Sequence, residues 1–246
     1  MRAASEEAAQ DAKGRAPSPR WLSGVDDQRS VIVFNFHCVG KPRRDLADGE
    51  DEVRVDSRQF AEILDVVAGR DDVRLTFDDG NTSDVAEALP ELLRRGLRAE
   101  FFICAGRFGT PEFVDEDDIR ELRRAGMSVG SHGMDHVPWR RLDRSAIDHE
   151  IVQAKERLEH ALQASVDTAA CPFGAYDRRT LSALRAAGFE RVYTSDRGRA
   201  GSTDWLVARN TVRRRDSAES IERLLNGTGA GLSPVDRAKR WVKRWR

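Results

Sequence analysis

The chain has 246 residues, a formal net charge of −1, 39% hydrophobic residues and 34% charged residues. This length can bury the core of one medium domain or two small ones, and the balanced charge gives no general attraction to nucleic acid. No apolar run approaches the roughly 20 residues that a membrane span requires. The N-terminus lacks the apolar segment of a secretory signal, so we expect a cytoplasmic protein. Three widely spaced cysteines predict reduced thiols rather than a disulfide framework.

Strands and helices are predicted to alternate along most of the chain. Residues 1–29 are rich in Ala, Glu, Arg and Ser and are predicted to form a disordered leader. Beyond them, apolar runs and alternating patterns predict strands at 31–36, 73–77, 99–104, 127–132, 168–171, 189–195 and 205–212. Apolar residues at helical spacing predict helices within 57–67, 82–96, 115–126, 145–162, 181–187 and 217–225. This order predicts parallel strands with crossover helices, arranged as a doubly wound sheet or a barrel.

Polar side chains follow several of the predicted strands, at the point where each strand ends. In both architectures ligands bind at the C-terminal ends of the strands. Those ends carry His37, Asp78-Asp79, Cys104, His132 and the segment Cys171-Pro172-Phe173-Gly174. The sequence therefore predicts a functional site at this edge. The cysteines could contact a metal there, but we favour small buried thiols.

Two adjacent carboxylates, Asp78 and Asp79, end the strand at 73–77 and are followed by Gly80. Adjacent residues of a strand point to opposite faces, so the two cannot do the same job unless the turn redirects one. This geometry predicts a division of labour, with one aspartate on a metal and the other handling protons. The motif by itself is also compatible with an ordinary turn.

His132 and His136 are spaced so that both imidazoles can lie on one side of a turn and share a metal ion. The alternative is one histidine packed at a strand end and one on the surface. One carboxylate and two imidazoles would leave coordination positions for water and substrate, which is typical of a catalytic rather than a structural divalent site.

The sequence resembles the polysaccharide deacetylases, carbohydrate esterase family four with the NodB-homology domain, and in particular their short members. Three segments resemble the signature motifs of the family, in order: Thr76-Phe77-Asp78-Asp79-Gly80, Ser131-His132-Gly133-Met134-Asp135-His136 and Cys171-Pro172-Phe173-Gly174-Ala175-Tyr176-Asp177. Two shorter segments, Phe34-Asn35-Phe36-His37 and Ala99-Glu100-Phe101-Phe102, resemble family strands. The resemblance covers about residues 30–226, the expected catalytic domain, and leaves a basic tail at 227–246.

The resemblance implies a distorted (β/α) barrel of about seven parallel strands. It also implies a metal-dependent hydrolase that removes an acetyl group, most often N-acetyl, from a sugar or glycan precursor. By position, Asp78 would be the general base, and Asp79, His132 and His136 would hold a divalent ion, zinc first, with cobalt or nickel as alternatives. The backbone N–H of Phe173 matches the family's oxyanion-stabilising position.

Two departures from the family pattern concern the catalytic groups. The third motif often carries an arginine that orients the base, and here the matching place is Ala170 or Cys171. Arg209 or Asp177 could supply the missing charge. No late Leu-x-His motif is present as a source of the general acid. His37 is our candidate acid, with a histidine packed at a strand end as the alternative.

Further residues of the third motif, Pro172 and Tyr176, together with Arg209, are expected near the substrate. Trp139 and Trp205 could stack on a sugar ring, although for Trp205 we favour packing at the rim. Two other functions stay open: a catalytically silent carbohydrate-binding protein, or an amidohydrolase of a non-sugar acetamide. The basic tail, with its interleaved tryptophans, could contact an anionic membrane surface or remain a solvated end.

Overall fold

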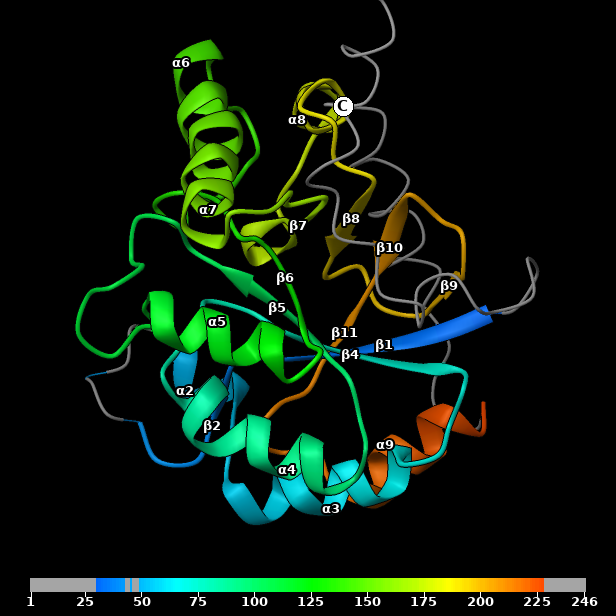
Figure 1. Ribbon diagram of the computed structural model, residues 1–246. Coiled ribbons are helices and arrows are strands. Elements are labelled where there is room, and N and C mark those ends of the chain that lie inside the picture. The colour runs from blue at the N-terminus through cyan, green and yellow to red at the C-terminus, as the bar shows by residue number, and fades with distance from the viewer. Residues whose placement is uncertain (1–29, 43–44, 46–48, 228–246) are drawn as a thin grey trace, which may run out of the picture.

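The computed structural model describes residues 30–42, 45 and 49–227 (Figure 1). The predicted leader at 1–29 and the basic tail beyond residue 227 lie outside these residues. No helix of the described part of the chain is long and apolar enough to cross a membrane.

One nine-stranded sheet forms the centre of the molecule (Figure 1). Across it the strands run in the order β10 (Leu206–Ala208), β8 (Arg191–Thr194), β7 (Thr168–Ala170), β6 (Ser128–Ser131), β5 (Glu100–Ile103), β4 (Val73–Phe77), β1 (Ser30–Phe36) and β11 (Asn210–Thr211), with all neighbours parallel. A ninth strand, β9 (Arg199–Gly201), pairs antiparallel with β1 and was not predicted. A separate parallel pair joins β2 (Cys38–Val39) and β3 (Arg54–Val55).

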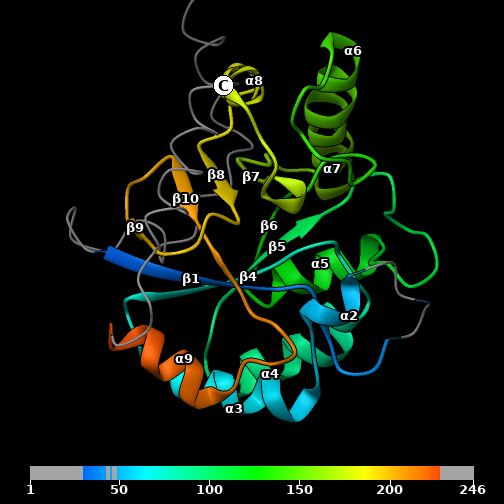
Figure 2. The ribbon, with the colours of Figure 1, turned by 180° about the vertical axis from the view of Figure 1, so that it is seen from behind.

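The segment 206–211 nearly closes this sheet into a barrel. Only Arg209 separates β10 from β11, yet β10 pairs with β8 at one end of the sheet and β11 pairs with β1 at the other. Figure 2 shows the segment, in orange, crossing between the two. Counted as one interrupted strand, it completes a ring of seven parallel strands. The predicted distorted barrel is therefore confirmed.

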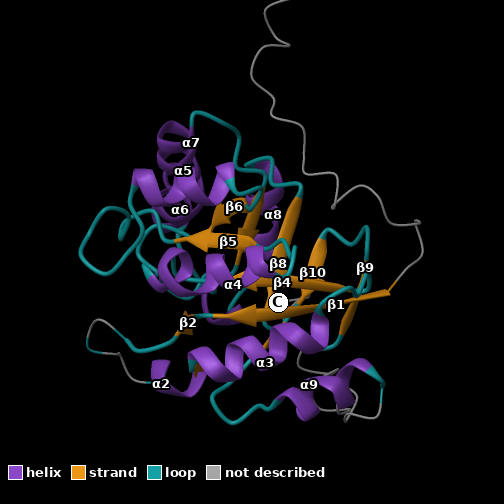
Figure 3. Ribbon diagram, turned by 60° about the horizontal axis from the view of Figure 1, so that its bottom comes forward, coloured by secondary structure: helices purple, strands orange, loops and turns teal. Residues whose placement is uncertain are grey.

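Helices cover the outside of the sheet (Figure 3). The helix α3 (Ser57–Val67) contacts both α4 (Leu89–Arg94) and α9 (Ala218–Leu225), and α5 (Glu116–Arg124) contacts α7 (Ala154–Leu162). Pro90 lies in the first turn of α4, where a missing N–H costs no hydrogen bond, and an irregular turn precedes it. The helical segments are α2 (Glu50–Val53), α3 (Ser57–Val67), η2 (Asp84–Ala88), α4 (Leu89–Arg94), α5 (Glu116–Arg124), α6 (Arg144–Ile147), η3 (Asp148–Gln153), α7 (Ala154–Leu162), η4 (Pro172–Gly174), α8 (Arg178–Ala186) and α9 (Ala218–Leu225).

The core has an outer and an inner part, because successive strand residues point to opposite faces. Ile32, Phe34 and Phe36 of β1 belong to the larger cluster between the sheet and its helices. Val31 and Val33 belong to a smaller cluster inside the barrel, with Phe102, Tyr193 and Val207 among its members. The next inward positions along β1 and β4 are polar, and they lead to the site.

Candidate active site

The turn after β4 separates the two aspartates. Asp78 continues the β4 direction, and its backbone N–H donates to the carbonyl of Phe36 over 2.9 Å. Asp79 has a φ of 78° and Gly80 a φ of 72°, both in the left-handed region that residues other than glycine rarely adopt. The positive φ at Asp79 redirects its carboxylate out of the strand alternation. The aspartates are thus fixed in different surroundings, although both are buried.

Arg209 donates two parallel hydrogen bonds, each 2.7 Å long, to the carboxylate of Asp78. Asn35 donates a further bond of 2.9 Å to Asp78 Oδ2, and its own side-chain oxygen accepts from Arg209 and Thr76. Burial by itself would raise the pKa of Asp78, but the Arg209 charge and the neighbouring histidines lower it to about 2. The guanidinium is itself fully buried. Asp78 is therefore an oriented anion at every physiological pH.

The ring of His132 is held with one nitrogen facing the aspartates. Its Nδ1 lies 2.8 Å from the carbonyl oxygen of Ala170, an acceptor, so Nδ1 must carry the hydrogen. Burial lowers the pKa of His132 to about 4, although the charges of Asp78 and Asp79 act in the opposite direction. The neutral ring then presents the Nε2 lone pair 3.7 Å from Asp79 Oδ1 and 3.8 Å from Asp78 Oδ2. Such an arrangement is typical of a metal-binding histidine.

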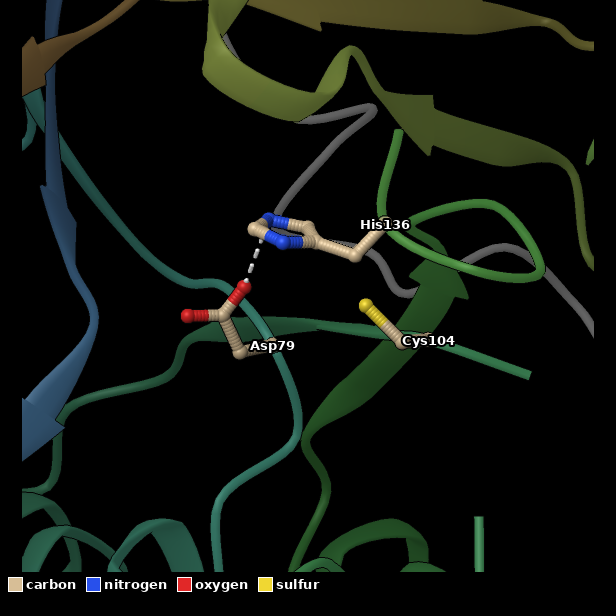
Figure 4. Close-up of side chains that lie close together, drawn as sticks. All are labelled: Asp79, Cys104 and His136. Atoms are coloured by element: carbon tan, nitrogen blue, oxygen red, sulfur yellow. Dashed lines mark ion pairs between the residues drawn. The ribbon is translucent and has the colours of Figure 1, made fainter. Parts of the chain in front are cut away.

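Asp79, His136 and Cys104 converge from three different segments (Figure 4). His136 Nε2 lies 3.1 Å from Asp79 Oδ1, and ligand atoms of all three residues lie within 4.8 Å of one another. Burial works to raise the pKa of Asp79, but the close histidines hold it well below its ordinary value. Burial also raises the pKa of the Cys104 thiol, whose Sγ donates weakly to the carbonyl of His132. Cys104 is thus a buried, protonated thiol beside the site, as the favoured prediction had it.

The set of Asp79, His132 and His136 fits a divalent cation. Asp79 Oδ1 is buried and accepts no hydrogen bond from any described residue. The lone pair of His132 faces the same oxygen, and such an encounter of electron-rich atoms is favourable only with a cation between them. Oxygen and nitrogen ligands at zinc bond lengths lie about 3.4 Å apart in a tetrahedral site. The separations of 3.1 and 3.7 Å from Asp79 Oδ1 agree with this value.

Two further predicted residues lie at this mouth of the barrel. His37 Nε2 is 3.9 Å from Asp78 Oδ2, which is too far for a hydrogen bond. The same Asp78 oxygen faces His132. Phe173, with a φ of 57°, forms the turn after β7, and its ring centroid lies 4.6 Å from that of His136. Its side chain is 65% exposed, whereas Pro172 beside it is buried. The mouth therefore combines a half-buried imidazole with an exposed aromatic ring.

Trp139 and Tyr176 do not lie where a sugar could reach them, and this part of the prediction is wrong. Both side chains are fully buried, and the two residues form a backbone bridge. The indole N–H of Trp139 donates to Glu150 over 3.2 Å, and the Tyr176 hydroxyl donates to Asp196 over 2.6 Å. Each polar tip of these aromatic side chains has an internal partner, so the rings were free to enter the core.

The choice between Arg209 and Asp177 as the orienting charge is decided by position. The Asp177 carboxylate accepts from the backbone N–H of Thr180 and of Arg141 and caps α8. Arg209, in contrast, contacts Asp78 directly.

Trp205 precedes β10, at the opposite end of the strands from the site, and the Arg185 guanidinium stacks 3.9 Å from the centre of its ring. Packing, the favoured alternative for Trp205, agrees with this position.

Several residues near the site were not identified from the sequence. Asn35 and Thr76 complete the Asp78 network, and a buried position for Asn35 within the apolar run of β1 was an available signal. Glu150 holds the loop before His136, but in the sequence it is one acid among many in a helix. Asp84 is fully buried, and neither of its carboxylate oxygens has a hydrogen-bond partner among the described residues. Burial and the charges of Asp79 and Asp78 raise its pKa well above the ordinary value.

The family model described as polysaccharide deacetylase matches residues 65–192, just over half of the chain. The chain belongs to the polysaccharide deacetylase family. The matched residues include the Asp78-Asp79 turn and both histidines that face Asp79, so family membership and site geometry rest on the same segments.

Two curated relatives agree with this family. The chain is 27% identical over 141 residues to YxkH of Bacillus subtilis, a protein provisionally named as a polysaccharide deacetylase. It is 26% identical over 145 residues to the chitooligosaccharide deacetylase of Azorhizobium caulinodans. These matches cover 57% and 58% of this chain, but only 50% and 66% of the respective relatives.

Two solved structures share the fold of this family member. The Streptococcus pyogenes deacetylase PplD, in complex with acetate, superposes with a TM-score of 0.69 and 17% identity over 80% of this chain and 98% of that one. IcaB from Ammonifex degensii superposes with a TM-score of 0.65 and 23% identity over 80% of this chain and 96% of that one. At these identities the likeness concerns the fold.

Proposed function

We propose that this polysaccharide deacetylase family member is a metal-dependent hydrolase that removes an acetyl group, most often N-acetyl, from a sugar or glycan precursor. The single observation that carries the proposal is the convergence of Asp79, His132 and His136 beside an Asp78 that Arg209 holds bidentately. A base, a cation-binding set and an exposed mouth are together what hydrolysis of an acetamide requires.

Asp79, His132 and His136 would hold the metal, and zinc suits one carboxylate and two imidazoles, with cobalt or nickel as alternatives. When bound, such an ion lowers the pKa of water and polarises the acetyl carbonyl. His132 is prepared for this role because its Nδ1 hydrogen is committed to Ala170 and its Nε2 is free. Asp79 contributes an oxygen that no described donor already occupies.

Asp78 would accept the proton of the attacking water. Its Oδ2 faces both His37 and His132, which places that oxygen toward the reacting atoms. A carboxylate whose pKa is about 2 is a weak base, so it can take this proton only if the pKa of the water is lowered. The main contribution of Asp78 would then be to orient the water rather than to be strongly basic. Arg209 fixes this orientation, which supports catalysis over the silent carbohydrate-binding alternative.

His37 would carry the proton onward to the leaving amine, because its Nε2 approaches the same Asp78 oxygen from the exposed side. The backbone N–H of Phe173 would stabilise the developing oxyanion, and the exposed Phe173 ring beside His136 would border the bound acetyl group. The two roles assign one group to each end of the bond that breaks.

The proposal is tested by acetate release from a panel of N-acetylated and O-acetylated sugars, oligosaccharides and small non-sugar acetamides. We expect the protein to release acetate from a sugar. A chelator should abolish this release, zinc or cobalt should restore it, and the Asp79→Asn variant should lack it. Release only from small acetamides would favour the amidohydrolase alternative. Sugar binding without release by the metal-loaded protein would contradict the proposal.

A further inference from the structure

Glu150 is a buried carboxylate outside the set of residues that face the substrate. It lies in η3 and is only 2% exposed. Its oxygens accept three hydrogen bonds, from the backbone N–H of Met134 over 3.1 Å, from that of Asp135 over 3.0 Å and from the indole of Trp139 over 3.2 Å. Among the described residues it forms no ion pair, but an imidazole nitrogen of His149 lies within 4.8 Å of one of its oxygens.

The loop that Glu150 holds is the one that ends at His136. The loop carbonyls of Gly133 and Met134 accept from the backbone N–H of Ala105 and Gly106, at 2.8 and 2.9 Å. The N–H groups of Met134 and Asp135 donate to Glu150 instead. Buried N–H groups without a partner are costly, so the carboxylate and the backbone together determine the path of the loop.

The loop is also strained and tightly packed against Glu150. Gly133 has a φ of 83°, and a Cβ there would lie 2.6 Å from Glu150 Oε2. His136 has a φ of 57°, in the left-handed region that residues with a side chain rarely adopt. Such a conformation persists only where surrounding contacts impose it.

The two histidines of the site are therefore held in different ways. His132 is fixed through its ring, because Nδ1 donates to Ala170 over 2.8 Å. Among the described residues, the Nδ1 of His136 has a 3.5 Å approach by Arg107 and no hydrogen bond to a backbone carbonyl. The Phe173 ring lies beside the His136 ring, but the position of the imidazole is set first by the backbone that carries it, and Glu150 holds that backbone.

We propose that Glu150 is a positioning residue for the metal site: by holding the N–H groups of Met134 and Asp135, it aims His136 at the position it shares with Asp79. This inference rests on the proposed function, because it assumes that His136 binds a metal. Glu150 acts through the loop and contacts neither metal nor substrate.

The test measures metal binding directly with Co²⁺, whose visible absorption reports ligand number and geometry. Glu150→Gln keeps the size of the side chain but replaces one of its two acceptor oxygens with an NH2 group. This group can only donate, so it cannot accept a hydrogen bond from the loop or from the indole. We expect Co²⁺ to bind this variant about 10–100-fold more weakly, the usual effect of removing a supporting contact, with an altered spectrum at saturation. Glu156→Gln removes an exposed carboxylate on the following helix α7 and should match the parent protein.

An unchanged Co²⁺ affinity and spectrum in Glu150→Gln would overturn the inference, even if the variant melts at a lower temperature, because Glu150 would then support only the fold. Failure of the parent protein to bind Co²⁺ would instead overturn the proposed metal site, and this inference with it. Equal weakening in Glu156→Gln would also contradict the inference, because the effect would follow from charge removal anywhere near this helix.

Discussion

The pair of Asp78 and Arg209 shows how single residues set the chemistry of the site. A buried ion pair gains little net stability, since desolvation opposes the attraction, but removing one partner leaves an uncompensated buried charge. Here the arginine also receives its position from Asn35 and Thr76, so the base is fixed by a network rather than by one contact. The ion pair therefore serves mainly to orient Asp78, and a large loss of stability is expected only when one partner is removed.

At this scale we predict that Arg209→Met destabilises the protein by about 3–5 kcal/mol at pH 7, because Asp78 loses its partner while remaining buried. The folded pKa of Asp78 is about 2, below its ordinary 3.8, so its stabilisation is present above 3.8 and is lost as the pH falls through 2. Without Arg209, burial should raise this pKa above 3.8, and stability should then fall as the pH rises. Urea unfolding between pH 4 and 8 measures the difference.

The double variant Asp78→Asn with Arg209→Met is the control for this prediction. It removes both charges, so it should recover much of the lost stability but none of the activity. A stability loss in Arg209→Met that is small and constant from pH 4 to pH 8 would show that the guanidinium does not control the charge of Asp78.

At the scale of elements, the turn between β4 and η2 gives the two aspartates their separate roles. A Cβ on Gly80 would lie 3.0 Å from Ile103 Cδ1 and 3.2 Å from Val114 Cγ2, so two neighbouring segments close over this turn. The glycine is needed for its conformation and for its lack of a side chain, and both requirements follow from the direction in which Asp79 must point.

We predict that Gly80→Ala costs more stability than Gly96→Ala, and that only Gly80→Ala weakens metal binding. Gly96 also has a positive φ, of 65°, but no atom lies within 4 Å of a Cβ there, so its substitution measures the left-handed cost alone, about 1 kcal/mol. Gly80→Ala should add about 1–3 kcal/mol for overpacking against Ile103 and Val114. Thermal unfolding of both metal-free variants, with a Co²⁺ titration, provides the comparison. Equal costs would mean that the core accommodates the methyl group.

The elements differ in how far the sequence could predict them. The helix α3 was predictable from the helical spacing of its apolar residues, and β1 from a short apolar run rich in β-branched and aromatic residues. The short strand β9 was not, because Arg199–Gly201 carries no pattern and is held by its pairing with β1. The Asp and His residues of the site were predictable from their spacing, whereas Glu150 was not, because its importance arises from a loop that only the fold brings against it.

At the scale of the whole molecule, closure of the barrel brings the two edges of the sheet, at β8 and β1, together. The segment 206–211 joins the two edges of the sheet, and Arg209, at the point where pairing changes from β8 to β1, is directed at Asp78. An arginine 131 residues away in sequence thereby serves the base. No local pattern could have indicated this contact, because it depends on the closure itself.

Closure also buries like charges close to one another, and this predicts that a metal stabilises the entire fold. Asp78 and Asp79 are adjacent and both buried, and among the described residues Arg209 forms an ion pair with Asp78 but not with Asp79. A cation that binds only the folded protein adds about 2.7 kcal/mol at one hundred times its dissociation constant, which corresponds to a rise in Tm of roughly 5–10 °C for a domain of this size. We expect this rise when zinc is added to the chelator-treated protein. The Asp79→Asn variant should lose most of it, because the site then lacks its anionic ligand, whereas Asp117→Asn, at an exposed position on α5, should retain it. A rise of the same size in Asp79→Asn would place the stabilising ion elsewhere on the molecule.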